Sequence, residues 1–140
     1  MNTLKFKNGD LFDIQKFLGE LKLSGRASRG RSKFIKLIEL KKKDLQEDLN
    51  EARKPYLELD ENGVPITEND MYKFKDESAK EKASEEMNAV FNEDAIFDIT
   101  EHVGKIKALY EALVNYPYEL EGAGANSYDL LLDQLEKTEE

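Results

Sequence analysis

The residues best suited to chemistry lie in one basic stretch, residues 26–33, which read RASRGRSK. Guanidinium groups donate paired hydrogen bonds to carboxylates and phosphates, and the free amides at a helix start also favour anions. We therefore predict an anion-binding or partner-binding patch whose candidate residues are Arg26, Arg29, Arg31, Lys33 and Lys36. Three anions fit this pattern: a carboxylate of the same chain, an acidic partner protein, or nucleic acid, which is bound through summed phosphate contacts.

One loop resembles the opening of a calcium-binding site. Glu58, Asp60 and Asn62 have the spacing of the first ligands. A working loop needs a bidentate glutamate at its twelfth position, which here is Asn69, and Pro65 disturbs the middle. We interpret this segment as a surface turn and predict no metal site there.

The remaining polar residues do not form a catalytic pattern. His102 is the single histidine, and the absence of cysteine excludes disulfides, thiolate metal sites and thiol nucleophiles. The glycines at 122 and 124 lack the third glycine and the preceding strand of a dinucleotide-binding motif. Serine-hydrolase, zinc-protease and P-loop motifs are also missing. We therefore predict that the protein is not an enzyme and uses no cofactor.

The basic stretch opens the longest helical pattern in the chain. Steps of three, four and seven residues lay one apolar stripe along a helix; its members are Phe34, Ile38, Leu45, Leu49, Ala52, Tyr56 and Leu59, and Ile35, Leu37 and Leu40 broaden it. We predict a helix from Ser28, as its N-cap, to Lys54, because Pro55 should end or kink it. Gly30 in the first turn weakens this helix by about 1 kcal/mol relative to alanine.

Shorter elements must pack against the long helix. Apolar periodicity predicts helices at 10–21 after Asp10, at 77–92, at 101–115 after Thr100, and beyond Ser127. Alternation predicts strands at 4–7 and 96–99, which we pair with each other, while 71–74 fits a short strand or an extended linker. The fold class is thus α+β, predominantly α, with a long helical hairpin formed by the helix at 77–92, a two-stranded antiparallel sheet and C-terminal helices.

Length and composition favour one soluble domain. A chain of 140 residues with 39% hydrophobic residues suits a single domain over 1–140, with 136–140 as a frayed tail. No run of 18 apolar residues predicts a membrane span, and charges at the N-terminus exclude a signal peptide. A long helix on a small domain often pairs with a second copy, so a homodimer is an open alternative.

The net charge of −9 is unevenly distributed. Residues 22–43 carry nine basic side chains and one acidic one, for +8, whereas residues 44–101 sum to −12. The basic patch from Arg26 to Lys43 therefore lies in an otherwise acidic chain. This layout is typical of a protein with an anionic partner, or of a patch that is neutralised by the chain's own carboxylates.

Three segments resemble a family of small uncharacterised proteins encoded by tailed phages and prophages of Gram-positive bacteria. They are residues 4–11 (LKFKNGDL), 28–34 (SRGRSKF) and 60–65 (DENGVP). The resemblance covers the first half of the chain well and the second half in outline. It implies a phage origin, a link to genes of the late tail and lysis region, and a place in the host cell cytoplasm or on the virion. It lends no catalytic residues.

These observations lead to one functional hypothesis and two alternatives. The first is a non-enzymatic phage accessory protein, virion-associated or host-directed, that binds another protein through the long helix or the patch. The second is an acidic inhibitor of a host nuclease or defence complex in which residues 44–101 imitate nucleic acid. The third is direct nucleic-acid binding through the basic patch.

Overall fold

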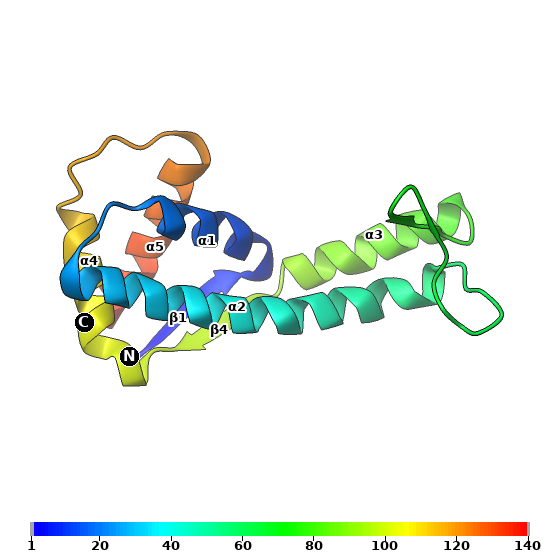
Figure 1. The fold of residues 1–140 in the computed structure, drawn as a ribbon, viewed down its shortest axis with the longest axis horizontal. Helices are drawn as coiled ribbons and strands as arrows, with labels where there is room; N and C mark the ends of the chain where they lie inside the picture. The colour runs from blue at the N-terminus through cyan, green and yellow to red at the C-terminus, as the bar shows by residue number, and fades with distance from the viewer. Residues whose placement is uncertain (1, 140) are drawn as a thin grey trace. The chain divides into compact units, whose positions relative to one another are not determined.

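The computed structural model describes residues 2–139, which group into two compact units. Unit 1 takes the described residues up to 42 and from 94 onward, and unit 2 takes residues 43–93. Figure 1 shows the helices α1 (Leu11–Glu20), α2 (Gly25–Arg53), α3 (Glu77–Phe91), α4 (Val103–Val114) and α5 (Gly122–Thr138), and the strands β1 (Thr3–Lys7), β2 (Thr67–Glu68), β3 (Met71–Tyr72) and β4 (Asp94–Asp98). The predicted α+β class, predominantly α, is confirmed. Whether the two units fold as one domain stays a prediction.

The sheet of unit 1 pairs the two strands that the sequence predicted. β1 and β4 run antiparallel, with Leu4 opposite Phe97 and Phe6 opposite Ala95. These four side chains are buried, and the residues between them are exposed. The alternation therefore gives the sheet one face toward the core and one toward solvent.

The two edges of this sheet differ. The Lys5 N–H donates to Gln134 Oε1 of α5 at 2.9 Å, so α5 covers the outer edge of β1. The Ile99 N–H donates to the carbonyl of Asn2, which extends the ladder. Because hydrogen-bonded and non-hydrogen-bonded pairs alternate, the N–H and C=O of Ile96 point away from β1. Within residues 2–139 no strand pairs with that edge of β4.

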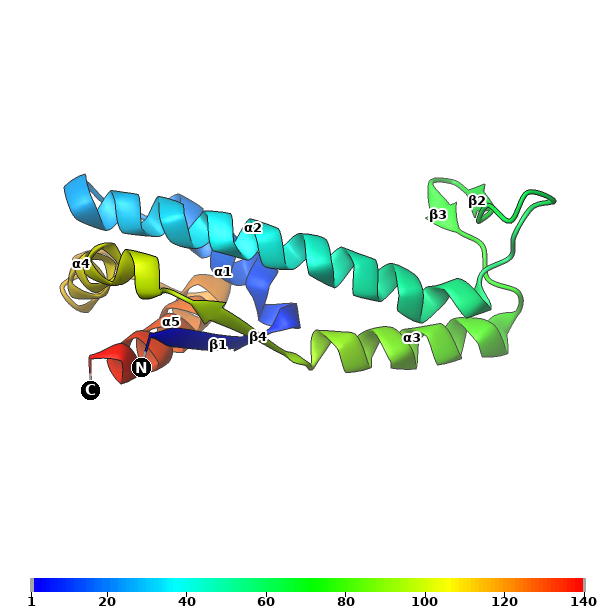
Figure 2. The ribbon, with the colours of Figure 1, turned by 90° about the horizontal axis from the view of Figure 1, so that it is seen from below.

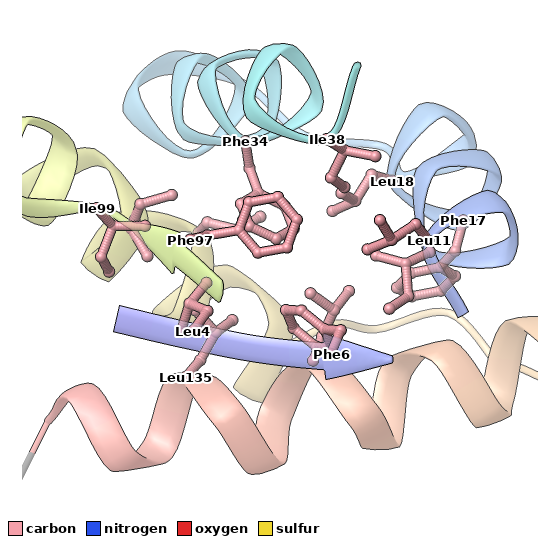
Figure 3. Close-up of a cluster of buried hydrophobic side chains, with 14 of the residues drawn as sticks. Leu4, Phe6, Leu11, Phe17, Leu18, Phe34, Ile38, Phe97, Ile99 and Leu135 are labelled. Carbon is pink, nitrogen blue, oxygen red and sulfur yellow. The ribbon is translucent and has the colours of Figure 1, made fainter. Parts of the chain in front are cut away.

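Three phenylalanines join the sheet to α2 in the core of unit 1. The rings of Phe6, Phe34 and Phe97 have centroids 5.4 to 6.1 Å apart. Figure 3 shows Phe34 extending from α2 toward Phe97 of β4, with Leu135 of α5 on the other side of β1. Ring pairs at this separation stabilise the folded state by more than the burial of their apolar area alone.

Helix α2 starts earlier than predicted and ends as predicted. It begins at Gly25, so the expected N-cap, Ser28, lies inside the helix, where its Oγ accepts a hydrogen bond from Arg31. The helix ends at Arg53, and residues 54–56 form a 3₁₀ turn that contains Pro55. Proline lacks the amide that the helix would need and therefore ends it here.

The other predicted caps form no capping hydrogen bond. Asp10 occupies the predicted N-cap position of α1, but its side chain makes no cap hydrogen bond. Thr100 instead donates its N–H and its hydroxyl to Asp98 Oδ1 at 2.9 and 2.5 Å. Ser127 lies inside α5, where it is fully buried. The sequence signal failed because a serine five residues into a helix looks the same as one at its start.

Helix α5 also continues further than the sequence indicated. It runs to Thr138, beyond the start of the predicted frayed tail at 136, and Glu140 lies outside the described residues. Leu131 and Leu135 are buried against the rest of unit 1. Their burial explains why the C-terminal turns hold their helical form. No helix among residues 2–139 is long and apolar enough to cross a membrane.

Unit 2 is built around the predicted helical hairpin. Figures 1 and 2 show α3 side by side with residues 43–53 of α2. Leu45 and Leu49 of α2 and the small residues Ala79 and Ala83 of α3 are buried. Asp76 caps α3 by accepting the Ala79 N–H at 2.7 Å. Between the helices, the short strands β2 and β3 pair antiparallel, which resolves the alternatives left open for 71–74 in favour of a strand.

Candidate functional site

Four of the five predicted patch residues lie on one face of α2. Arg26, Arg29, Lys33 and Lys36 follow each other at steps of three, four and three residues, which aligns them along a helix. We call these four residues the basic stripe. A rotation of 100° per residue places the stripe opposite the buried Phe34 and Ile38. Arg26, Arg29 and Lys36 are accordingly exposed, and Lys33 is half-buried.

Arg31 is separated from the stripe. Its Nη1 donates to the Leu21 carbonyl at 2.5 Å and its Nη2 donates to Ser28 Oγ at 3.0 Å. Leu21 caps the C-terminus of α1, where carbonyls lack helical partners. Arg31 therefore ties α2 to the end of α1, and its guanidinium is already engaged within the chain.

Arg26 is supported by a glycine of the neighbouring helix. A Cβ placed on Gly104, near the start of α4, would meet the Arg26 guanidinium, with its Cζ at 3.2 Å. The guanidinium therefore lies close to Gly104 with Nη2 nearest, where a side chain at 104 would displace it. This contact orients one end of the stripe.

No carboxylate of the described residues neutralises the basic stripe. Between residues 2 and 139, ion pairs within 4.0 Å join Lys73 to Glu58 and Glu68, and Lys107 to Glu139. None of them involves α2. The predicted alternative of internal neutralisation thus has no direct contact in the described part of the chain.

Leu40 continues the stripe, and sequence reasoning misplaced it. It follows Lys36 by four residues and is 60% exposed, although the apolar pattern assigned it to the buried side. Lysine stems are apolar, so Leu40 and the stem of Lys36 together form an apolar strip beside the charges. The signal that could have found this is angular: Leu40 lies about 120° from Phe34, on the side of the stripe.

The other predicted sites are turns and supports. Asp60 Oδ1 accepts the N–H groups of Asn62 and Val64 at 2.8 and 2.9 Å, so this carboxylate closes its own turn. Gly63 in that turn has φ 77°, a conformation that glycine adopts without strain. The described residues hold no group of three or more His, Cys, Asp or Glu suited to a metal ion. The two hydrogen bonds to Asp60 and the conformation of Gly63 form the surface turn that the sequence predicted.

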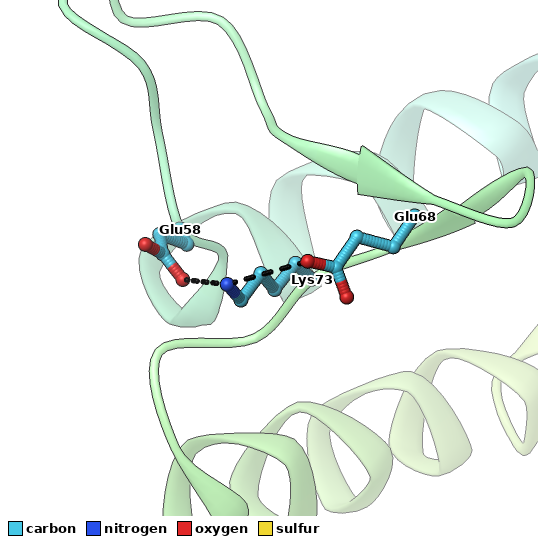
Figure 4. Close-up of polar contacts among 3 residues, drawn as sticks. All are labelled: Glu58, Glu68 and Lys73. Carbon is cyan, nitrogen blue, oxygen red and sulfur yellow. Dashed lines mark ion pairs between the residues drawn. The ribbon is translucent and has the colours of Figure 1, made fainter.

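The same region of unit 2 contains an exposed ion-pair cluster. Lys73 Nζ lies 3.5 Å from Glu58 and 3.4 Å from Glu68, and Figure 4 shows it between the two carboxylates. The attraction of Glu58 and then of Glu68 raises the pKa of Lys73. All three side chains are well exposed, so solvent screens their interaction and the cluster orders the turn more than it stabilises the fold.

The two units differ in net charge. Residues 43–93 contain 15 acidic and seven basic side chains, a net −8, so unit 2 carries nearly all of the chain's net charge of −9. The acidic side chains of residues 44–51 on α2 and of α3 are exposed. The basic stripe belongs to unit 1, whose net charge is close to zero, so the stripe is a local concentration of positive charge.

Comparisons with known proteins give no relative. No protein-family model matches the chain, and neither the curated proteins nor the solved structures give a match.

Proposed function

We propose that the chain is a non-enzymatic phage accessory protein, virion-associated or host-directed, that binds an acidic partner protein through the basic stripe. The observation that supports this is the presence of four aligned cations without an ion-pair partner among residues 2–139, in a chain with 30 acidic residues. Complementary charges on a partner would accelerate association and fix its register on α2.

The chemistry of the stripe favours protein over nucleic acid. Leu40 adds an exposed apolar side chain to the stripe, and such a side chain fits an apolar anchor of a protein partner. Single-stranded nucleic acid is usually held by aromatic side chains that stack on bases. The exposed aromatic residues of the described chain are Phe12, Tyr72 and Tyr118, and none belongs to α2.

The test is site-specific photo-crosslinking in infected host cells. A photoreactive phenylalanine at Lys36 should give an adduct with a protein, and the same group at Lys16, an exposed lysine of α1, should not. Arg29→Glu in the Lys36-labelled chain should abolish the adduct. Identical adducts at the two positions, or an adduct that survives Arg29→Glu, would refute the proposal.

Nucleic acid is the competing outcome, and it has its own measurement. A gel-shift assay with duplex DNA at about 50 mM salt should show no complex, since low salt favours phosphate contacts. A complex that is lost in the Arg29→Glu/Lys36→Glu variant, but not in the matched control Lys5→Glu/Lys16→Glu, would replace the protein partner with nucleic acid. Both variants change the net charge by the same amount at exposed sites.

A second candidate function rests on unit 2. Its net charge of −8 supports the alternative of an acidic inhibitor that occupies the nucleic-acid site of a host nuclease or defence complex. Binding of the chain to such a target should fall steeply with salt, because summed charge would dominate, and DNA should compete. Binding that is insensitive to both salt and DNA would exclude this candidate.

A further inference from the structure

A tyrosine-rich groove in unit 1 is lined by residues of α1, α5 and the segment that joins α4 to α5. The segment 115–121 links α4 to α5 in extended form (Figure 1). Two adjacent hollows of about 280 and 310 Å³ flank this segment and share Tyr116, Tyr118 and Leu120. Tyr128 of α5 lines the first hollow and Phe17 of α1 lines the second. We call this surface the tyrosine groove. It shares no residue with the basic stripe.

The aromatic rings of the groove are held in place before any ligand binds. The Lys22 N–H donates to the Tyr116 hydroxyl at 3.2 Å, and the Tyr128 hydroxyl donates to the Leu113 carbonyl at 2.7 Å. Tyr116 and Tyr118 have ring centroids 5.2 Å apart with a 57° tilt. A ligand would therefore meet fixed aromatic surfaces and lose little free energy to ordering them.

The groove attracts cations. Four carboxylates and a single cation, Lys22, line the two hollows; the carboxylates are Glu20, Glu119, Glu121 and Asp129. Lys22 Nζ lies 4.7 Å from the centroid of the Tyr118 ring, so the face of that ring already holds a cation in the free chain. Tyr118 is itself 49% exposed and can receive a second cation or an apolar ring from outside.

We propose that the tyrosine groove binds a proline-rich segment with a basic residue, in the polyproline II conformation, of a partner protein. Such a segment has no internal hydrogen bonds and is ordered before binding, and it docks through proline rings on aromatic surfaces. In this arrangement the two adjacent hollows receive proline rings of the segment, while its arginine or lysine faces the carboxylates. An acidic segment would instead meet like charge, and the groove thus selects the opposite partner chemistry from the basic stripe.

The chain's composition makes a direct test simple. It contains no tryptophan, so a tryptophan placed on the peptide reports binding without background. The probe is an array of synthetic peptides with two prolines three positions apart and an arginine at either end, each with two twins. One twin replaces both prolines with alanine and the other replaces arginine with glutamate. We expect binding by members of the parent set, and at least about tenfold weaker binding by both kinds of twin.

Variants of the groove assign the binding. Tyr118→Ala removes an exposed ring and should weaken peptide binding about tenfold without changing the far-UV circular dichroism. Glu119→Gln/Glu121→Gln should weaken it, while the matched control Asp133→Asn/Glu136→Gln, at two exposed positions of α5, should not. Lys22→Ala should strengthen it, since the internal cation no longer covers Tyr118.

Failure is equally defined. The proposal is overturned if no array member binds, if the alanine or glutamate twins bind as well as their parents, or if Tyr118→Ala leaves affinity unchanged. The basic stripe stays intact in every one of these variants, so these outcomes do not depend on the proposed function.

Discussion

Gly30→Ala should destabilise the protein, although alanine is the better helix former. Gly30 is buried in α2 where α4 crosses it. A Cβ at this position would meet the carbonyl oxygen of Lys105 and lie 2.8 Å from its carbonyl carbon and 3.4 Å from Leu109 Cβ. The first two atoms belong to the α4 backbone and cannot yield unless the whole helix moves.

The expected magnitude follows from two opposing effects. Helix propensity alone would stabilise the alanine variant by about 1 kcal/mol. Overpacking a closely packed site costs about 1–3 kcal/mol, and we take the upper value of about 3 kcal/mol because the clash is with backbone. We expect a net loss of about 2 kcal/mol, which lowers the ratio of folded to unfolded chain roughly 30-fold.

Gly19→Ala is the matched control with the opposite sign. Gly19 lies in α1, and a Cβ placed there has no atom within 4 Å. Only propensity then acts, so this variant should gain about 0.5–1 kcal/mol. Urea unfolding followed by circular dichroism at 222 nm measures both, with the slope of the transition expected to stay constant. A Gly30→Ala variant as stable as the natural chain would refute the close approach of α2 and α4.

Three further predictions concern individual polar side chains. Ser127 is fully buried and its Oγ has no hydrogen-bond partner among residues 2–139, so Ser127→Ala should raise the free energy of unfolding by about 0.5–1 kcal/mol; a lower urea midpoint would contradict this. Arg31→Ala should lower the free energy of unfolding by about 1–2 kcal/mol in the same assay because the Leu21 carbonyl loses its donor, whereas Arg29→Ala, at an exposed position, should change it by no more than about 0.5 kcal/mol. Equal effects of the two variants would count against the separation of Arg31 from the stripe. The Thr100 hydroxyl and then its N–H lower the pKa of Asp98. The charged carboxylate therefore stabilises the fold above the ordinary pKa of about 3.9, and this contribution is lost as the pH falls through the lower pKa of the folded state. Thr100→Val should raise the Asp98 pKa in an NMR titration, and an unchanged pKa would disprove this cause.

Periodicity predicted the helices and strands well because burial acts on one face of each. The stripe from Phe34 to Leu49 and the alternation at 4–7 both follow a core that lies on a single side. The pairing of β1 with β4 was also predictable, since few other strands were available. These features depend on hydrophobic pattern alone.

Helix ends and close contacts could not be predicted in the same way. By helix propensity Gly30 destabilises α2, but the absence of a side chain allows close contact with Lys105, which is 75 residues away in the chain. Ser127 looked like a cap and is a buried helix residue. Each depends on what lies across the interface, and a single sequence does not contain that information.

The sequence located the candidate patch but did not identify all of its members correctly. Charge clustering located the region, and helical geometry puts Arg29 and Lys36 on its open side. No feature of the sequence distinguished Arg31 from the other patch residues, although its guanidinium is held by the end of α1. The tyrosine groove was missed because Tyr128 of α5 and Phe17 of α1 join Tyr116 and Tyr118 only once the helices have packed.

The unpaired edge of β4 is protected against pairing with the same edge of a second copy. Two copies joined antiparallel through this edge and centred on Ile96 would place Asp94 of one directly opposite Asp98 of the other. Each join would thus press together two pairs of like charges, which is unfavourable in a ladder. The aspartates at either end of this short strand therefore oppose edge-to-edge pairing of two copies, even though the isoleucine between them is 54% exposed.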